Sequence, residues 1–105
     1  MLPPINRLPK KQISSVLRRG THVRSGIAEL VYRKSVGTPR FAFIVSTKID
    51  KRATARNRMR RVLSESVRHI LATIAPIDGI FIAKKNFAEL PQTEVEKIVR
   101  ALLGL

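Results

Sequence analysis

The sequence predicts an α/β fold, an α+β sandwich whose helices pack on a central sheet of about four strands. The chain order is helix, strands, helix, strand, helix. Three observations predict this class. Apolar residues from Met59 to Ile74 recur at three- and four-residue steps, the spacing of one buried helix face. Arg40 to Ser46 alternates by face, as a strand does. The short apolar run Ile80 to Ala83 reads as a further buried strand, and a second segment with helical spacing follows it.

The length, charge and composition of the chain limit the classes of function that it can have. The chain has 105 residues, enough for a single domain with a modest core, and we expect residues 1–105 to form one domain. Its formal net charge is +14 while 44% of its residues are hydrophobic, which favours a folded protein with a polyanionic partner over a disordered basic tail. It has no cysteine, no apolar signal region and no membrane-spanning run, so a cytoplasmic protein without a membrane partner is expected.

The N-terminal part predicts a loose segment followed by a helix. Residues 1–8 contain two prolines and are interpreted as a flexible arm. Pro9 suits the first position of a helix, and Gly20 is expected to end it. The apolar stripe of this helix comprises Ile13, Val16 and Leu17.

The next part of the chain predicts strands. Ile27 to Arg33 forms one, a turn at Ser35 to Pro39 follows, and Arg40 to Ser46 forms the next; a short strand at Thr21 to Arg24 is left open. In the strand at 40–46, one face carries Phe41, Phe43 and Val45 and the other carries Ala42, Ile44 and Ser46. Tyr32 is interpreted first as a tyrosine at the core edge, with a stacking platform for an RNA base as the alternative.

The stretch Lys48 to Arg61 is the strongest functional signal. Half of its positions are cationic, and they run into the start of the long helix, expected near Asp50 to Ala53 with Asp50 as N-cap. Cations at a helix N-terminus oppose the helix dipole but make an anion site, and a phosphate backbone is the natural anion for so basic a chain. An ordinary solvated charged face is the alternative, although such faces usually mix signs. The expected buried face of this helix comprises Met59, Val62, Leu63, Ser66, Val67, Ile70, Leu71 and Ile74.

The C-terminal part predicts a strand and a last helix. Pro76 ends the long helix, and Lys84 and Lys85 follow the strand, where contact with phosphate and simple solvation are equally open. The last helix is expected to start near Pro91 or Thr93, with a capping box formed by Thr93 and Glu96. Glu89, Glu94 and Glu96, three of the seven acidic residues, lie at this end, which should face away from RNA.

The sequence offers no catalytic constellation. His22 and His69 are far apart and are expected at the surface, and no metal-ligand spacing surrounds them. Asp50 and Asp78 are interpreted as cap or turn residues. We therefore predict no catalytic residue and no metal site in the protein itself.

The segment F-I-V-S-T-K-I-D-K-R-A-T-A-R-N-R-M-R-R, residues 43–61, closely resembles the signature of the bacterial ribonuclease P protein subunit. The hallmark is Arg56-Asn57-Arg58 at a helix start after a strand end. Asp78 to Lys85 resembles the family's next strand, and with an N-terminal helix ending in R-R-G the likeness covers nearly the whole chain. It implies a fold like domain 2 of ribosomal protein S5, with a left-handed βαβ crossover against the general right-handed rule.

The resemblance also implies a function. The protein would be the non-catalytic subunit of an endoribonuclease that removes the 5′ leader of precursor tRNA, binding both the ribonuclease P RNA and the precursor. The chemistry would belong to the RNA and its Mg²⁺ ions, and the protein would be monomeric before assembly. The residues expected to bind the catalytic RNA are Lys48, Lys51, Arg52, Arg56, Asn57, Arg58, Arg60 and Arg61.

The resemblance further implies a cleft between the sheet and the first helix for the single-stranded leader. Its expected residues are Ile13, Leu17, Tyr32, Phe41 and Phe43. The family usually carries aromatic residues near positions 13 and 17. Aliphatic side chains cannot stack on bases, so leader contact here should depend more on shape and charge. Two alternatives share part of this evidence: a small structural RNA-binding protein, for example a ribosome-associated one, and an enzyme with its own hydrolytic site.

Overall fold

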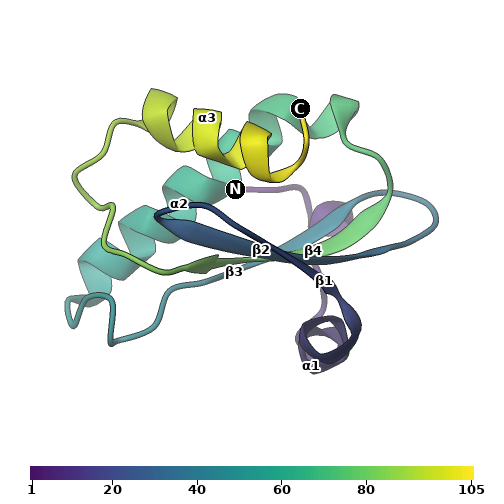
Figure 1. The fold of residues 1–105 in the computed structure, drawn as a ribbon, viewed down its shortest axis with the longest axis horizontal. Coiled ribbons are helices and arrows are strands. Elements are labelled where there is room, and N and C mark those ends of the chain that lie inside the picture. Colours follow the sequence, from purple (N-terminus) through teal and green to yellow (C-terminus); the bar gives the residue numbers. More distant parts are fainter.

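The computed structural model describes residues 1–105 as three α-helices and one four-stranded sheet (Figure 1). The helices are α1 (Lys10–Arg19), α2 (Ala53–Ile70) and α3 (Gln92–Leu102). The strands are β1 (Thr21–Arg24), β2 (Ala28–Lys34), β3 (Arg40–Ile44) and β4 (Ile77–Ala83). Short 3-10 turns precede α1 and follow α2, at Pro4–Asn6 and Leu71–Thr73. None of the helices has the length and apolar character needed to cross a membrane.

The sheet has the strand order β1-β2-β4-β3, which makes β1 and β3 its edges. β2 pairs antiparallel with both β1 and β4, whereas β3 and β4 are parallel and are connected through α2. The predicted mixed α/β fold with a four-stranded sheet is confirmed, including the short strand β1 that the sequence left open. The left-handed crossover stays an expectation from the resemblance.

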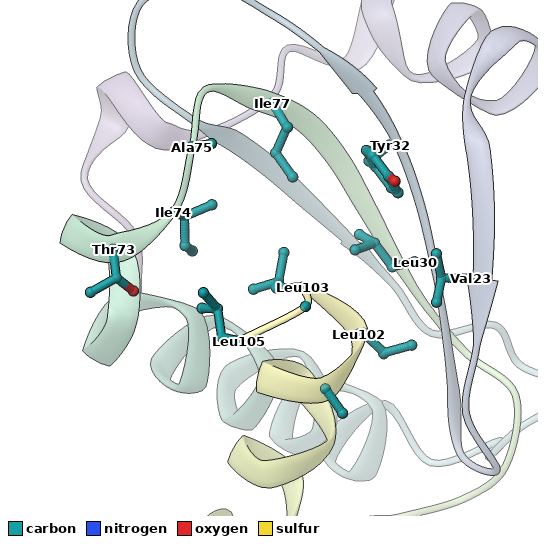
Figure 2. A pocket seen from close by; sticks show the side chains of 12 residues that line it. Val23, Leu30, Tyr32, Thr73, Ile74, Ala75, Ile77, Leu102, Leu103 and Leu105 are labelled. Carbon is teal, nitrogen blue, oxygen red and sulfur yellow. The ribbon is translucent and has the colours of Figure 1, made fainter.

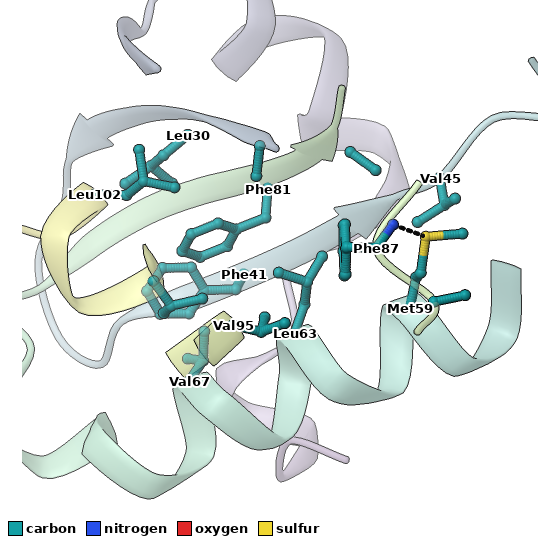
Figure 3. Close-up of a cluster of buried hydrophobic side chains, with 14 of the residues drawn as sticks. Leu30, Phe41, Val45, Met59, Leu63, Val67, Phe81, Phe87, Val95 and Leu102 are labelled. Carbon is teal, nitrogen blue, oxygen red and sulfur yellow. Dashed lines mark hydrogen bonds between the residues drawn. The ribbon is translucent and has the colours of Figure 1, made fainter. Parts of the chain in front are cut away.

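Helices cover both faces of the sheet: α2 and α3 lie on one face and α1 lies on the other (Figure 1). The predicted alternation of side chains is confirmed, although β3 ends at Ile44 rather than at Ser46. Phe41 and Val45 belong to the main core of seventeen buried residues beneath α2 and α3 (Figure 3). Ala42 and Ile44 pack on the opposite face against the smaller cluster that contains Val16 of α1.

From Met59 to Ile70, α2 buries the face that the periodicity predicts. The helix ends at Ile70, so Leu71 and Ile74 lie beyond it and the expectation that Pro76 ends it is wrong. Met59, Leu63 and Val67 are fully enclosed, and Figure 3 shows them pointing toward Phe41 and the sheet. Ser66 is also buried, and its hydroxyl donates to the Val62 carbonyl at 2.8 Å, so the polar group on this face is satisfied.

The expectation of a flexible arm at residues 1–8 is wrong. Leu2 is only 2% exposed and Leu8 is 6% exposed, so both contribute to the core. Asn6 donates to the Pro39 carbonyl at 2.8 Å, and the Leu8 amide donates to the Phe41 carbonyl at 2.9 Å. Burial of two leucines and pairing of backbone groups along β3 hold this segment, and two prolines reduce the entropy lost in ordering it.

Two predicted caps are also wrong. The start of α2 lies within the predicted range, but Arg52 is the N-cap residue and no side chain caps the helix; Asp50 lies two residues earlier. In α3, Pro91 occupies the N-cap position, so Thr93 is already inside the helix and makes no capping hydrogen bond. Gly104, with φ at +76°, ends α3 as its left-handed conformation requires.

Candidate RNA interface

The eight residues predicted to bind RNA lie on one continuous segment, which we call the basic ridge. It runs along the connection after β3 and the first turns of α2. Arg56 and Arg60 are partly buried, and the other members are exposed. The basic ridge comprises Lys48, Lys51, Arg52, Arg56, Asn57, Arg58, Arg60 and Arg61.

Only one cation of the basic ridge is paired with an acid. Arg52 forms an ion pair with Asp50, its Nη2 lying 2.8 Å from Oδ2, and this arginine side chain is still 67% exposed. Arg56 donates instead to the backbone carbonyls of Asp50 and Lys51, at 3.0 and 2.8 Å. A neutral carbonyl orients a guanidinium without cancelling its charge, so Arg56 stays available to an external anion.

The remaining cations of the basic ridge either bond to neutral oxygen atoms or have no partner within the protein. Arg58 donates through Nε to the Ala88 carbonyl at 2.7 Å, and Arg60 donates to the side-chain oxygen of Asn57. The side chains of Lys48, Lys51 and Arg61 make no ion pair or hydrogen bond within the protein. The structure thus presents a charged surface of one sign, which distinguishes it from an ordinary mixed-sign face.

The segment that follows β4 holds the uncapped start of α2. The Asp50 carboxylate accepts from the Arg52 amide at 2.9 Å and from Asn86 Nδ2 at 2.8 Å. The Met59 sulfur accepts a hydrogen bond from the Phe87 amide at 3.5 Å (Figure 3). The Ala88 carbonyl accepts the hydrogen bond from Arg58 Nε. Asp50 accepts hydrogen bonds from the side chain of Arg52, from its backbone amide and from Asn86. These bonds hold the pKa of Asp50 well below its usual range. These contacts offset the unfavourable placement of cations at a helix N-terminus.

A cavity of about 690 Å³, which we call the α2–β3 groove, opens beside the basic ridge. Side chains of α2, of the edge strand β3 and of the N-terminal segment bound it. Its lining residues are Met1, Leu2, Arg7, Phe41, Phe43, Asn57, Arg60, Arg61, Ser64 and Glu65. It thereby combines an aromatic wall with arginines from the basic ridge.

The five residues predicted for the leader cleft do not lie together. Ile13 and Leu17 of α1 pack against one face of the sheet, whereas Phe41 and Phe43 lie on the opposite face and line the α2–β3 groove. Tyr32 lies elsewhere again, in the wall of an apolar cavity of about 440 Å³ near the C-terminus (Figure 2). It packs against the main core, which agrees with its interpretation as a tyrosine at the core edge.

Strand alternation is the physical reason for this correction. Because neighbouring side chains of a strand point to opposite faces, Phe41 and Phe43 cannot share a face with Ala42 and Ile44. The sheet side chains that do pack on the α1 side are Ala42, Ile44, Val31, Ile80 and Ile82. The sequence contained the signal for the first two, since it already separated them from the phenylalanines.

An ion-pair cluster that the sequence did not predict fixes α1 over the sheet. Asp78 is buried in β4, which begins at Ile77 rather than near Ile80, so its interpretation as a turn residue is wrong. Arg40 contacts both of its carboxylate oxygens at 3.0 Å and also donates to Gln12 of α1 at 2.8 Å. Arg33 lies 3.6 Å from the same carboxylate and donates to Ser15 Oγ at 2.8 Å.

A second unpredicted cluster surrounds Glu29 at the other end of the same sheet face. This buried carboxylate receives Arg24 Nε at 3.0 Å, His22 Nδ1 at 3.1 Å and Lys84 Nζ at 3.3 Å. Burial raises the pKa of Glu29, but the hydrogen bonds from Arg24, His22 and Lys84 outweigh it and lower that pKa to about 2. Lys84 therefore pairs with an acid inside the protein. The sequence had left open only contact with phosphate or simple solvation for this lysine.

The carboxylates of these sites do not suit a divalent cation. No group of three or more His, Cys, Asp or Glu side chains is arranged to hold a metal ion. Asp50, Glu29 and Asp78 are each already surrounded by basic or amide donors, which repel a cation and occupy its ligand oxygens. Both histidines lie at the surface as expected; His69 Nδ1 is 2.7 Å from Glu96 Oε1.

Comparisons with known proteins agree with this geometry. A family model described as Ribonuclease P matches residues 2–104. The chain is 28% identical over 107 residues to the ribonuclease P protein component of Xanthomonas oryzae pv. oryzae, covering 95% of this chain and 74% of that protein. It is 33% identical over 92 residues to the ribonuclease P protein component of Pseudomonas aeruginosa, covering 86% and 68%.

Solved structures show the same fold. The ribonuclease P protein of Thermotoga maritima, solved in complex with 1-(4-fluorophenyl)-2-thiourea, matches with a TM-score of 0.84 at 22% identity, covering 92% of this chain and 96% of that one. The ribonuclease P protein of Staphylococcus aureus matches with a TM-score of 0.84 at 18% identity, covering 94% and 93%. Because the family model spans nearly the whole chain, this protein belongs to the ribonuclease P protein family.

Proposed function

We propose that this protein is the subunit that binds the catalytic RNA of ribonuclease P and the 5′ leader of precursor tRNA, and so assists Mg²⁺-dependent removal of the leader. One observation carries the proposal. The cations of the basic ridge are held by neutral carbonyl or amide oxygens or are free, and only Arg52 has an acidic partner.

This arrangement suits a phosphate backbone. Each cation that neutralises a phosphate releases condensed counterions, which drives association at low salt. Arg56 and Arg58 are already oriented by bonds to carbonyl groups, so less side-chain entropy is lost when they contact RNA. The free N–H groups of the uncapped α2 N-terminus add donors to the same surface.

For the leader, we expect the face of the sheet beside α1. Ile13 and Leu17 with Ile44 and Ile82 provide an aliphatic surface there, and the Glu29 cluster holds Arg24 and Lys84 at its end. Aliphatic groups cannot stack as aromatic rings do, so recognition should depend on shape and phosphate contacts rather than on base identity.

The proposal assigns bond cleavage to the RNA. Mg²⁺ bound by the RNA would supply activation of the attacking water and stabilisation of charge at the scissile phosphate. The protein's own groups would reduce repulsion between the two RNA backbones. Binding of precursor tRNA should therefore strengthen, and the concentration of Mg²⁺ that cleavage requires should fall. We also expect a cytoplasmic protein that is monomeric before it assembles with RNA.

Reconstitution tests the proposal. The protein is added to bacterial ribonuclease P RNA at low Mg²⁺, and cleavage of precursor tRNA is followed. Stimulation of cleavage supports the proposed role. Cleavage without any RNA subunit would identify an independent nuclease, and RNA binding without stimulation would favour a structural RNA-binding protein; either result would overturn the proposal.

A further inference from the structure

The α2–β3 groove is lined by an aromatic ring, that of Phe43, which the protein covers only in part. Phe43 is the register partner of Phe81 on β4, and the two rings stack with centroids 5.8 Å apart and planes 9° apart. β3 is an edge strand, and beyond it only the N-terminal segment pairs with the sheet, through a single bridge between Arg7 and Phe41. The ring is only partly buried and lines the groove, whereas Phe41 beside it is 2% exposed and offers little surface.

The groove is also charged in a way that suits a nucleotide. Arg60 and Arg61 line it and have no acidic partner, and Asn57 lines the same wall with its amide. The single acid there, Glu65, is already neutralised by Arg68 at 2.7 Å and by the Met1 amino group at 2.5 Å. The field inside the groove is therefore positive, and one of its walls can stack against a flat ring.

These features select an unpaired nucleotide over other ligands. A purely apolar ligand would leave Arg60 and Arg61 desolvated without a partner, and a simple anion would not use the ring of Phe43. An intact helix cannot present a base face, because its bases are stacked on one another. A splayed-out nucleotide supplies both a π face and a phosphate, and about 690 Å³ is ample room for it.

We propose that the α2–β3 groove receives one unstacked nucleotide of the catalytic RNA, with its base against Phe43 and its phosphate at Arg60 and Arg61. This inference rests on the proposed function, since it assigns the groove to the RNA that the basic ridge binds. The catalytic RNA is the expected source because Asn57, Arg60 and Arg61 belong to both surfaces.

Fluorescence provides the first test. The chain contains no tryptophan, so Phe43→Trp places a single indole in the groove. Addition of the ribonuclease P RNA alone should quench its emission through base stacking. Val36→Trp is the control, because Val36 is 92% exposed in the turn between β2 and β3. Equal quenching of both indoles, or quenching of the groove indole only after precursor tRNA is added, would overturn the assignment.

Affinity provides the second test. Phe43→Leu should weaken binding of the catalytic RNA on the order of tenfold, the effect expected for loss of one base–aromatic stack. Phe43→Tyr should keep the affinity, because it keeps the ring. Phe81→Leu is the matched control: it removes the buried partner ring and should lower the melting temperature without changing the affinity of the folded protein.

The outcomes separate this inference from the proposed function. If the unmodified protein binds the RNA and stimulates cleavage while Phe43→Leu binds within about twofold of it, the groove assignment is wrong and the proposed function stands. If the unmodified protein does not bind the RNA at all, the proposed function is wrong.

Discussion

The guanidinium of Arg40 contacts the carboxylate of Asp78 at two points across the parallel β3–β4 pair, with both N–O distances at 3.0 Å. Asp78 is buried, and Arg40 also donates to Gln12 of α1. The pair therefore joins the sheet to the helix that packs on it, and the position of α1 depends on a carboxylate inside a strand.

We expect Asp78→Ala to destabilise the protein by about 3 kcal/mol, because it leaves the partly buried Arg40 without its partner. For a domain of this size the melting temperature should fall by more than about 10 °C. Lys97→Ala, which removes an exposed pair with Glu94, is the control and should change stability by less than about 1 kcal/mol. Thermal unfolding followed by circular dichroism measures both, and equal melting temperatures would contradict the role given to Asp78.

Arg61→Ala should reduce the slope of log affinity against log salt for the catalytic RNA by about one, since one phosphate contact is lost. The side chain of Arg61 has no partner within the protein, so its removal should leave the melting curve unchanged. Arg100→Ala, on α3, is the control because that exposed arginine already pairs with Glu96 outside the α2–β3 groove. Filter binding over a range of salt concentrations checks this, and identical slopes for both variants would argue against phosphate contact at Arg61.

Acid should destabilise the protein partly through Glu29. Its pKa is lowered from 4.5 to about 2 in the folded state, so the stabilisation that it contributes is complete above pH 4.5 and is lost as pH falls toward 2. Glu29→Gln should therefore flatten the fall of melting temperature over this interval. Glu94→Gln, at an exposed pair, should retain the steep fall of the native protein. The two pH profiles would coincide if Glu29 made no such contribution.

Gly20 and Gly26 should respond to alanine with opposite signs. A Cβ at Gly20 would lie 2.6 Å from the Val16 carbonyl oxygen and 2.7 Å from Val31 Cγ1, so Gly20→Ala should cost about 1–3 kcal/mol through overpacking. At Gly26 nothing lies within 4 Å, and Gly26→Ala should stabilise by about 0.5 kcal/mol through the unfolded state. Chemical denaturation measures both, and a neutral Gly20→Ala would show that α1 can move away from β2.

Local periodicity explains why most of the fold could be predicted. The face of α2 that contains Met59 and Val67 follows from spacing alone, and the alternation at Phe41 and Ala42 follows from strand geometry. The basic ridge could be predicted for the same reason, because its residues are contiguous in sequence. Gly20 was expected to end α1 and does so, although close approach to β2, rather than a left-handed conformation, requires glycine there.

The rest depended on contacts between distant segments, which periodicity does not encode. The pairing of Arg40 with Asp78 and the cations around Glu29 arise only when all four strands lie in register. The predicted leader cleft was wrong because nothing in the sequence states which face of β3 meets α1. The expected cap at Asp50 was wrong because its carboxylate is engaged by the Arg52 amide and by Asn86 before the helix begins.

The attachment of the α2 start to the segment after β4 also affects biosynthesis. Ala88, which orients Arg58, lies 30 residues farther along the chain, and the partner of Met59 comes 28 residues after it. A nascent chain whose ridge has just left the ribosome would carry Arg58 without the Ala88 carbonyl that orients it and Met59 without the Phe87 amide. The start of α2 therefore reaches its final arrangement only once translation has passed this second segment.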